Sequence, residues 1–274
     1  MTRFANRTAI VTGGASGIGH ALCDQLAAAE ANVFVADIDI ARAREMAAAI
    51  QTRGGRAEAV QADVSQAPDI ERLVTAVVTS HGRLDYMFNN AAIGIVGELR
   101  DGNVEDFRRV VDVNLFGVVQ GTMAAYRVML RQGFGHIVNV SSVTGLMPTP
   151  ILTAYSTTKW AIVGFSTALR AEAAALGVKV SVACPGLVRT DIGERNVYWN
   201  VRKEDHLAQL PLRWAIEPGQ AAKGILRGVA RNQEIIVFPF SARVAWWMYR
   251  ACPLVFAPLL QGMLKRFRPL RIKP

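Results

Sequence analysis

Three residues near the middle of the chain could together move a proton. Tyr155 and Lys159 stand four positions apart, and if the run TAYSTTKWAIVGFSTALRAEAAAL is helical, this spacing places both side chains on one face. A phenol with a pKa near ~10 is a poor general base at neutral pH, but a neighbouring lysine ammonium favours the phenolate and lowers that pKa. Ser142, thirteen residues before Tyr155, ends the apolar run HIVNVSS and could offer its hydroxyl to the same reacting oxygen.

The same segment also fits a purely structural role when it is taken alone. Tyrosine and lysine at helical spacing commonly form a solvated helix face, and a serine after a strand is commonly a turn or a cap. This segment alone favours the structural role, so the choice depends on the elements that would position the three side chains.

Length and composition favour one globular α/β domain. The chain has 274 residues, of which 51% are hydrophobic and 19% charged, a balance that argues against disorder. Cys23, Cys184 and Cys252 are far apart and fit neither a disulfide framework nor a metal spacing, so we expect no metal site and reduced, cytoplasmic thiols. The start MTRFANRTAIVTGG lacks an apolar stretch of signal-peptide length, so no export signal is expected.

A glycine-rich turn joins the first expected strand to the first expected helix. The strand RTAIVT covers residues 7–12, and Gly13, Gly17 and Gly19 lie between it and the helical pattern GGASGIGHALCDQLAAAEANV. Glycines here allow a tight backbone and let a pyrophosphate approach the amides at the helix N-terminus. Because a strand precedes the turn and a helix and second strand follow it, the turn predicts a dinucleotide site.

The second expected strand, residues 32–36, ends at Asp37, which favours NAD over NADP. An acid at this position can accept hydrogen bonds from both ribose hydroxyls and would repel a 2′-phosphate. Ser16 and Ile38 beside it bring no positive charge to neutralise such a phosphate. Asp37 could instead be the N-cap of the next helix, although Asp39 could fill that role.

Helical and strand patterns then alternate without a linker, a repeat or a low-complexity segment. This alternation predicts a doubly wound parallel sheet, a Rossmann fold, with helices on both faces and right-handed connections. We expect a single domain over residues 1–238, with residues 239–274 as an extension that is not an independent domain.

The motifs together resemble the short-chain dehydrogenase/reductase family, the NAD(P)-dependent type with a Tyr-xxx-Lys active site. The matching pieces fall in the family's order between residues 8 and 190. They are Thr12-Gly13-xxx-Gly17-Ile18-Gly19, Asp63-Val64, Asn89-Asn90-Ala91-Ala92, Asn114 in DVNLFG, Ser142, Tyr155-xxx-Lys159, Pro185-Gly186 and Thr190. Ala92 departs from the family's usual glycine, which we expect to shift the backbone slightly without loss of binding.

This resemblance implies a role for each matching residue. Tyr155 would be the acid/base, Lys159 would bind the nicotinamide ribose and lower the tyrosine pKa, Ser142 would orient the carbonyl or alcohol, and Asn114 would hold a water that connects Lys159 to solvent. The implied cofactor contacts are Gly13, Ser16, Gly17, Ile18, Gly19, Asp37, Ile38, Asp63, Val64, Asn90, Ala91, Tyr155, Lys159, Pro185, Gly186, Val188 and Thr190. Asn114 could instead have a structural role, as a buried asparagine whose side chain hydrogen-bonds to the backbone.

The loops expected at the substrate side are largely apolar. Residues 93–96 and 143–152 are almost wholly apolar, and the segment after Thr190 holds Tyr198 and Trp199. A hydrophobic secondary alcohol or its ketone therefore fits better than a sugar or a charged acid. The alternative is a non-catalytic dinucleotide-binding regulator or scaffold, which the intact catalytic set argues against. The resemblance implies a homodimer or homotetramer.

Basic residues gather in the extension. The net charge is +9, and residues 239–274 hold seven Lys or Arg and no acid, which leaves the first 238 residues at +2. The apolar part, residues 251–264, is interrupted by Pro253 and Pro258 and is shorter than the ~20 residues that span a bilayer. Peripheral contact with an anionic membrane and coverage of the cleft or a subunit interface both stay open. Interleaved aromatics and prolines disfavour nucleic acid.

Overall fold

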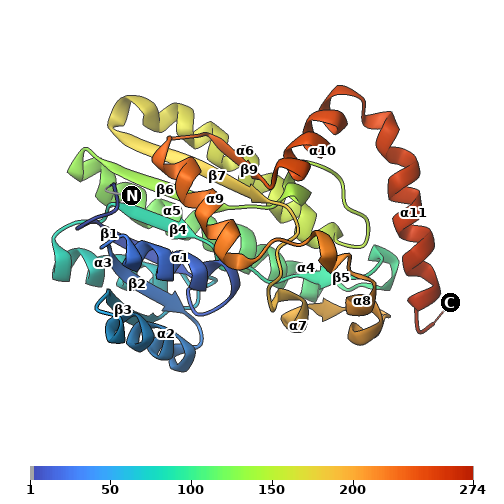
Figure 1. The fold of residues 1–274 in the computed structure, drawn as a ribbon, viewed down its shortest axis with the longest axis horizontal. Coiled ribbons are helices and arrows are strands. Elements are labelled where there is room, and N and C mark those ends of the chain that lie inside the picture. Colours follow the sequence, from blue (N-terminus) through green and yellow to red (C-terminus); the bar gives the residue numbers. More distant parts are fainter. Residues whose placement is uncertain (1–2, 274) are drawn as a thin grey trace.

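Seven parallel strands form the central sheet of the computed structural model, which describes residues 3–273 (Figure 1). The order is β3-β2-β1-β4-β6-β7-β9. The strands are β1 Thr8–Thr12, β2 Asn32–Asp37, β3 Arg56–Gln61, β4 Tyr86–Asn89, β6 Gly135–Val140, β7 Val178–Pro185 and β9 Ile235–Phe238. The predicted doubly wound Rossmann sheet is confirmed.

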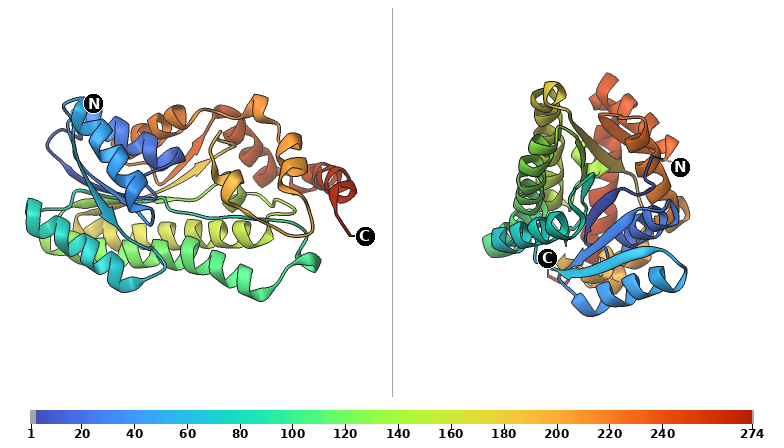
Figure 2. Two further views of the ribbon diagram at one scale, coloured as in Figure 1. Left: turned by 90° about the horizontal axis from the view of Figure 1, so that it is seen from below. Right: turned by 90° about the vertical axis from the view of Figure 1, so that its left-hand side faces the viewer.

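Helices cover both faces of this sheet (Figure 2). One layer holds α1 Gly17–Ala28, α2 Ile40–Thr52 and α9 Pro218–Ala230, and the other holds α3 Ala67–His81, α4 Val104–Val111, α5 Gly117–Gln132 and α6 Thr153–Ala173. Successive strand residues point to opposite faces, so Val11 packs with the first layer and Ile10 with the second. The strands are buried on both faces, which explains their nearly continuous apolar runs.

The strand order reverses between β1 and β4. The chain runs outward from β1 through β2 to β3, and then returns to the other side of β1. In open α/β sheets, ligands bind at such a switch point, beyond the carboxyl ends of the strands. The glycine-rich turn after β1 and Asn90 after β4 both lie there.

A small lobe stands over the carboxyl ends of the strands. It consists of β5 Ile95–Val96 and β8 Val197–Tyr198, which pair in parallel, with α7 Ile192–Arg195 and α8 Lys203–Gln209. Short 3₁₀ turns complete the connections at Leu99–Asp101, Val143–Gly145, Ala174–Leu176 and Leu212–Trp214. Trp199 is buried beneath the lobe, and its indole N–H donates to the Asp106 carboxylate at 2.8 Å.

Residues 239–273 form a C-terminal arm that leaves the sheet and returns to the small lobe (Figure 1). It contains α10 Phe240–Ala251, α11 Ala257–Phe267 and the 3₁₀ turns Pro253–Phe256 and Arg268–Leu270. Phe267 is buried against Val96, and the Arg271 guanidinium forks onto the Asp101 carboxylate at 2.7 and 3.0 Å. Among residues 3–273, none of the helices is both long and apolar enough to cross a bilayer.

Candidate active site

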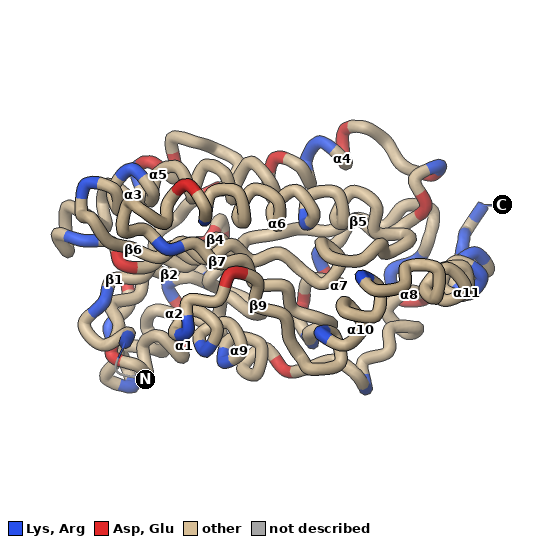
Figure 3. The backbone as a smooth tube through the Cα atoms, turned by 90° about the horizontal axis from the view of Figure 1, so that it is seen from above, with Lys and Arg blue, Asp and Glu red and all other residues tan. Residues whose placement is uncertain are grey.

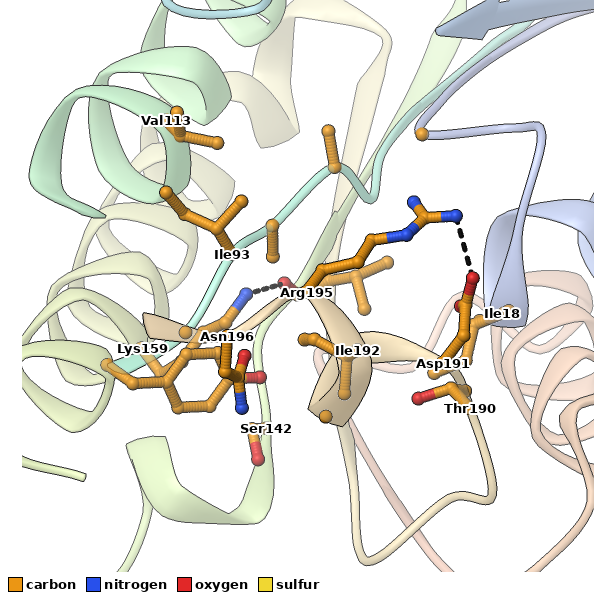
Figure 4. A pocket seen from close by; sticks show the side chains of 18 of the residues that line it. Ile18, Ile93, Val113, Ser142, Lys159, Thr190, Asp191, Ile192, Arg195 and Asn196 are labelled. Atoms are coloured by element: carbon orange, nitrogen blue, oxygen red, sulfur yellow. Dashed lines mark hydrogen bonds and ion pairs between the residues drawn. The ribbon is translucent and has the colours of Figure 1, made fainter. Parts of the chain in front are cut away.

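A cleft of about 1140 Å³ runs along the carboxyl ends of the strands, between the sheet and the small lobe (Figure 4). It gathers residues that are up to 199 positions apart in sequence, from Gly13 to Leu212. Of the residues proposed from the sequence as catalytic or as cofactor contacts, all line the cleft except Gly19 and Asn114. On the substrate side Tyr198 lines the cleft, whereas Trp199 is buried and does not.

The glycine-rich turn shapes one end of the cleft. Gly13 has φ +62°, and a side chain there would lie 2.9 Å from the Ala91 Cα. At Gly19 a side chain would overlap the Gly13 carbonyl oxygen, so Gly19 allows the close packing of helix α1 under the turn and is not itself on the cleft surface. The Ser16 side chain does not cap α1, which leaves the first-turn amides of the helix available to an anion.

Asp37 ties the end of β2 to this turn. Its carboxylate is nearly buried and accepts from the Ala15 amide at 3.0 Å and from the Asp39 amide at 3.1 Å. Asp39 is the N-cap of α2, because its side chain accepts from the Arg42 amide at 3.1 Å. Asp37 is therefore free of the capping role and faces the cleft, with Ile38 exposed beside it.

Thr12 and Asn90 join the ends of β1 and β4. The Thr12 hydroxyl accepts from the amides of Asn90 and Ala91 at 3.0 and 3.2 Å, and the Asn90 side chain donates to the Thr12 carbonyl at 3.0 Å. Ala92 is not among the described residues with positive φ, so the usual glycine is not needed for the backbone here. The cleft is also lined by Asp63, Val64 and residues of the segment from Pro185 to Thr190.

Tyr155, Lys159 and Ser142 meet at the other end of the cleft. Tyr155 and Lys159 share one face of α6, and the Lys159 ammonium lies 5.2 Å from the centre of the Tyr155 ring. That ammonium is buried and donates to the Val140 carbonyl at 2.9 Å. Ser142 follows β6, where its hydroxyl accepts from the Thr144 amide at 3.2 Å.

Burial controls the protonation of this pair. Removal from water raises the pKa of Tyr155 to about 12, although the Ser142 side chain works in the opposite direction. Burial likewise lowers the pKa of Lys159 to about 8. The expected lowering of the tyrosine pKa by Lys159 is therefore absent in the chain alone, because burial is the largest influence on the pKa of both groups.

Lys159 has spare hydrogen-bonding capacity where a dinucleotide would lie. An ammonium has three donors, and within residues 3–273 only the Val140 carbonyl accepts from this one. A buried donor without a partner is costly, so ribose hydroxyls would satisfy it. Together with the glycine turn and Asp37, this unmet demand fits a nicotinamide dinucleotide.

Asn114 supports the cleft from beneath. It lies fully buried in a π-helical turn, Asp112–Phe116, between α4 and α5. Its side chain exchanges two hydrogen bonds with the Ile93 backbone, at 2.9 and 2.8 Å, and donates to the Thr158 hydroxyl at 3.3 Å. These bonds use both N–H donors of the amide and one lone pair of its oxygen, so Asn114 could bind the water of a relay to Lys159 only through the second lone pair of that oxygen.

Two residues of the small lobe were missed by the sequence reasoning. The Arg195 guanidinium donates to the Ser16 hydroxyl at 3.2 Å and to the Asp191 carboxylate at 2.7 Å, and Figure 4 shows it pointing away from Lys159 and Ser142. Asn196 also lines the cleft, and its carbonyl oxygen is buried without a partner among the described residues. No local motif marks either residue; their only signal was a position shortly after Thr190.

Comparisons with known proteins agree with this site. A family model described as short chain dehydrogenase matches residues 7–200. A 3-oxoacyl-(acyl-carrier-protein) reductase of Synechocystis sp. is 35% identical over 233 residues, which cover 85% of this chain and 92% of that protein. A Mycobacterium tuberculosis protein, SadH, is 30% identical over 273 residues, which cover 98% of this chain and 99% of SadH. SadH is described as an oxidoreductase on a provisional basis.

Solved structures agree as well. A short chain dehydrogenase/reductase of Burkholderia phymatum in complex with NAD superposes with a TM-score of 0.85 at 25% identity, over 92% of this chain and 95% of that one. LigD of Sphingobium sp. shares the fold, with a TM-score of 0.79 at 24% identity over 92% and 97% of the two chains. The chain therefore belongs to the short-chain dehydrogenase/reductase family and is an oxidoreductase of that family.

Proposed function

We propose that the protein interconverts a hydrophobic secondary alcohol and its ketone with NAD(H). The observation that supports this most is the convergence of Tyr155, Ser142 and a buried, under-bonded Lys159 at one end of a cleft whose other end suits a dinucleotide. Formation of NADH from NAD and an apolar secondary alcohol tests the proposal. The alternative, a non-catalytic dinucleotide-binding module, would need no such convergence.

The protein's share of the chemistry lies in binding and proton transfer. When bound, NAD supplies the hydride acceptor. The Lys159 ammonium would hold the ribose hydroxyls, and the glycine turn with the α1 N-terminus would hold the pyrophosphate. Tyr155 would exchange a proton with the substrate oxygen, to which Ser142 would donate a hydrogen bond. Because the Tyr155 phenol stays protonated at neutral pH, it is suited to act as the acid in ketone reduction.

Arg195 would add a contact from the small lobe to the cofactor end of the cleft. It bonds Ser16 beside the turn that would hold the pyrophosphate. An arginine at this place can exchange Ser16 for a phosphate oxygen with little movement. The small lobe would thereby close over bound cofactor and exclude water.

We expect Asp37→Ala to weaken NAD binding about 10- to 100-fold, because a charged acceptor for the ribose hydroxyls is lost. The guanidinium groups of Arg42 and Arg195 already pair with the Asp191 carboxylate, at 3.7 and 2.7 Å, so neither is free to bind the 2′-phosphate of NADP. The measurement is the Kd of NAD and of NADP for both proteins. Asp37→Asn is the matched control, since it keeps the shape that supports the Ala15 amide. A wild-type preference for NADP contradicts the cofactor proposal.

The substrate proposal rests on the lining of the cleft toward the small lobe. Apolar side chains dominate this part: Ile93, Val96, Leu152, Leu187, Ile192, Leu207, Leu210 and Leu212. Burying apolar substrate surface against them contributes about 25 cal/mol per Å². Asn196, with its unpaired oxygen, is the candidate to bind a second polar group of the substrate.

Assembly into a homodimer or homotetramer is proposed through α5 and α6. Their outward faces expose large apolar side chains, among them Met123, Leu130 and Trp160. Light scattering gives the mass; a monomer at all concentrations contradicts the proposal.

We further propose that residues 239–273 extend the domain and do not fold as a second one. The arm has one buried large side chain at its end, Phe267, and Arg268 bonds Glu98 at 2.9 Å. Because the arm has so little hydrophobic core of its own, it should unfold together with the domain. Calorimetry of the wild-type protein is expected to give one cooperative unfolding transition. A second transition in wild type, which the Phe267→Ala variant loses, would show that the arm unfolds separately and would contradict this.

A further inference from the structure

Helix α10 carries an apolar stripe that none of residues 3–273 covers. Phe240, Val244, Trp247 and Met248 recur at helical spacing and are 74%, 39%, 58% and 51% exposed. The opposite face packs on the body of the protein through Ala242 and Trp246. Helix α10 therefore buries one apolar face and presents another to its surroundings.

The elbow after α10 continues this apolar surface. Leu254 and Val255, in the turn Pro253–Phe256, are 82% and 57% exposed. Tyr249 of α10 packs edge-on against Phe256, with ring centres 5.5 Å apart, which fixes the elbow to the helix. The elbow thus packs on the helix that carries the stripe, and we call these six exposed residues the arm patch.

Positive charge flanks the stripe of the arm patch. Arg243 and Arg250 are seven positions apart on α10, on the flank of the stripe, whereas Lys265 and Arg266 lie farther along the arm, in the last turn of α11. Within residues 3–273 none of these four forms an ion pair, whereas Arg268 and Arg271 are paired with Glu98 and Asp101. Figure 3 shows the Lys and Arg positions of α10 and α11, where no acid occurs.

We propose that the arm patch docks on an anionic lipid surface. Exposed Trp and aliphatic side chains beside unpaired arginines are what an interfacial helix offers to headgroups and acyl chains. A second copy of the chain is the competing occupant. Two-fold packing of the same patch would bring Arg243 and Arg250 of both copies together without an acid in either arm to compensate them.

The arm would hold the body of the protein at the membrane in a fixed orientation. Its far end is clamped to the small lobe by Arg271 on Asp101 and by Phe267, and Asn200 exchanges hydrogen bonds with the Lys273 backbone at 2.9 and 3.0 Å. Its near end continues from β9. With both ends fixed, docking of the patch sets the orientation of the small lobe, and hence of the cleft, relative to the lipid.

Flotation of the full-length protein with vesicles tests the proposal. Vesicles of phosphatidylcholine alone are compared with vesicles that also contain phosphatidylglycerol, at low and high salt. The protein is expected to float with the anionic vesicles, at least about tenfold more than with the neutral ones, and to be released by salt. Trp247→Glu with Met248→Glu should lower binding about tenfold or more, and Arg243→Gln with Arg250→Gln should lower it on anionic vesicles only.

Matched controls keep the test specific. Trp214→Glu removes a tryptophan that is 69% exposed outside the arm, and Arg44→Gln removes an exposed arginine of α2; both should float like wild type. Thermal unfolding checks that each variant is folded. Absence of flotation by folded wild type overturns the proposal. So does self-association of wild type that Trp247→Glu abolishes, because the patch would then bind a second copy.

Discussion

Tyr155→Phe is expected to lower kcat by about 10²- to 10⁴-fold while leaving the Kd of NAD nearly unchanged. The change removes one oxygen, the only group in the proposed mechanism that exchanges a proton with the substrate, and general acid–base catalysis contributes about that factor. The ring, its packing and the Lys159 ammonium beside it stay in place. Turnover is followed by the absorbance of NADH, and NAD affinity by calorimetric titration.

Tyr86→Phe is the control for this prediction. Tyr86 lies at the start of β4, away from the cleft, and its hydroxyl donates to the Arg3 carbonyl at 3.5 Å. Its loss should leave kcat within about twofold. Turnover by Tyr155→Phe that equals wild type would remove Tyr155 from the acid/base role; loss of NAD binding would instead assign Tyr155 a binding role.

Lys159→Met is expected to abolish most turnover and yet to stabilise the protein without cofactor. The ammonium is buried with one hydrogen bond and no carboxylate partner among the described residues, and burial lowers its pKa from 10.5 to about 8. That difference corresponds to about 3 kcal/mol of free energy of unfolding. Because methionine leaves the Val140 carbonyl without its donor, the net gain expected at pH 7 is about 1–3 kcal/mol.

The gain should depend on pH in a definite direction. Between pH 8 and 10.5 the unfolded lysine still holds its proton while the folded one releases it, so wild-type stability rises with pH in this window. The advantage of Lys159→Met is therefore full below pH 8 and vanishes by about pH 10.5. Denaturant unfolding at several pH values measures it. The Kd of NAD should rise about 10- to 100-fold in the variant; destabilisation at pH 7 together with unchanged NAD affinity would contradict the account.

Features of the fold and of the site that follow local patterns could be predicted from the sequence. Strand and helix periods repeat every few residues, so the doubly wound sheet followed from apolar runs such as RTAIVT and from the helical runs between them. Gly13 and Asp37 could be placed because a turn after the first strand and an acid after the second meet at the same edge of a parallel sheet. Tyr155 and Lys159 share a face by helical spacing alone.

The remaining features depend on contacts between distant residues. The clamp between Arg271 and Asp101 joins positions 170 residues apart, and no local pattern marks either partner. Arg195 reaches Ser16 across 179 residues. The direction of the Tyr155 pKa also depends on how deeply the tyrosine is buried, which spacing does not reveal; the lysine neighbour alone predicted the opposite direction.

One measurement tests the central claim, NAD-linked hydride exchange with an apolar secondary alcohol, most directly. Purified protein is mixed with NAD and with a panel of steroid, aliphatic and aromatic secondary alcohols, each paired with a close analogue that carries a carboxylate, and NADH is followed by absorbance. The account predicts NADH formation with at least one apolar member, and at least about tenfold higher kcat/KM for it than for its charged analogue. NADH formation only with charged analogues, or none from a folded protein that binds NAD, would contradict it.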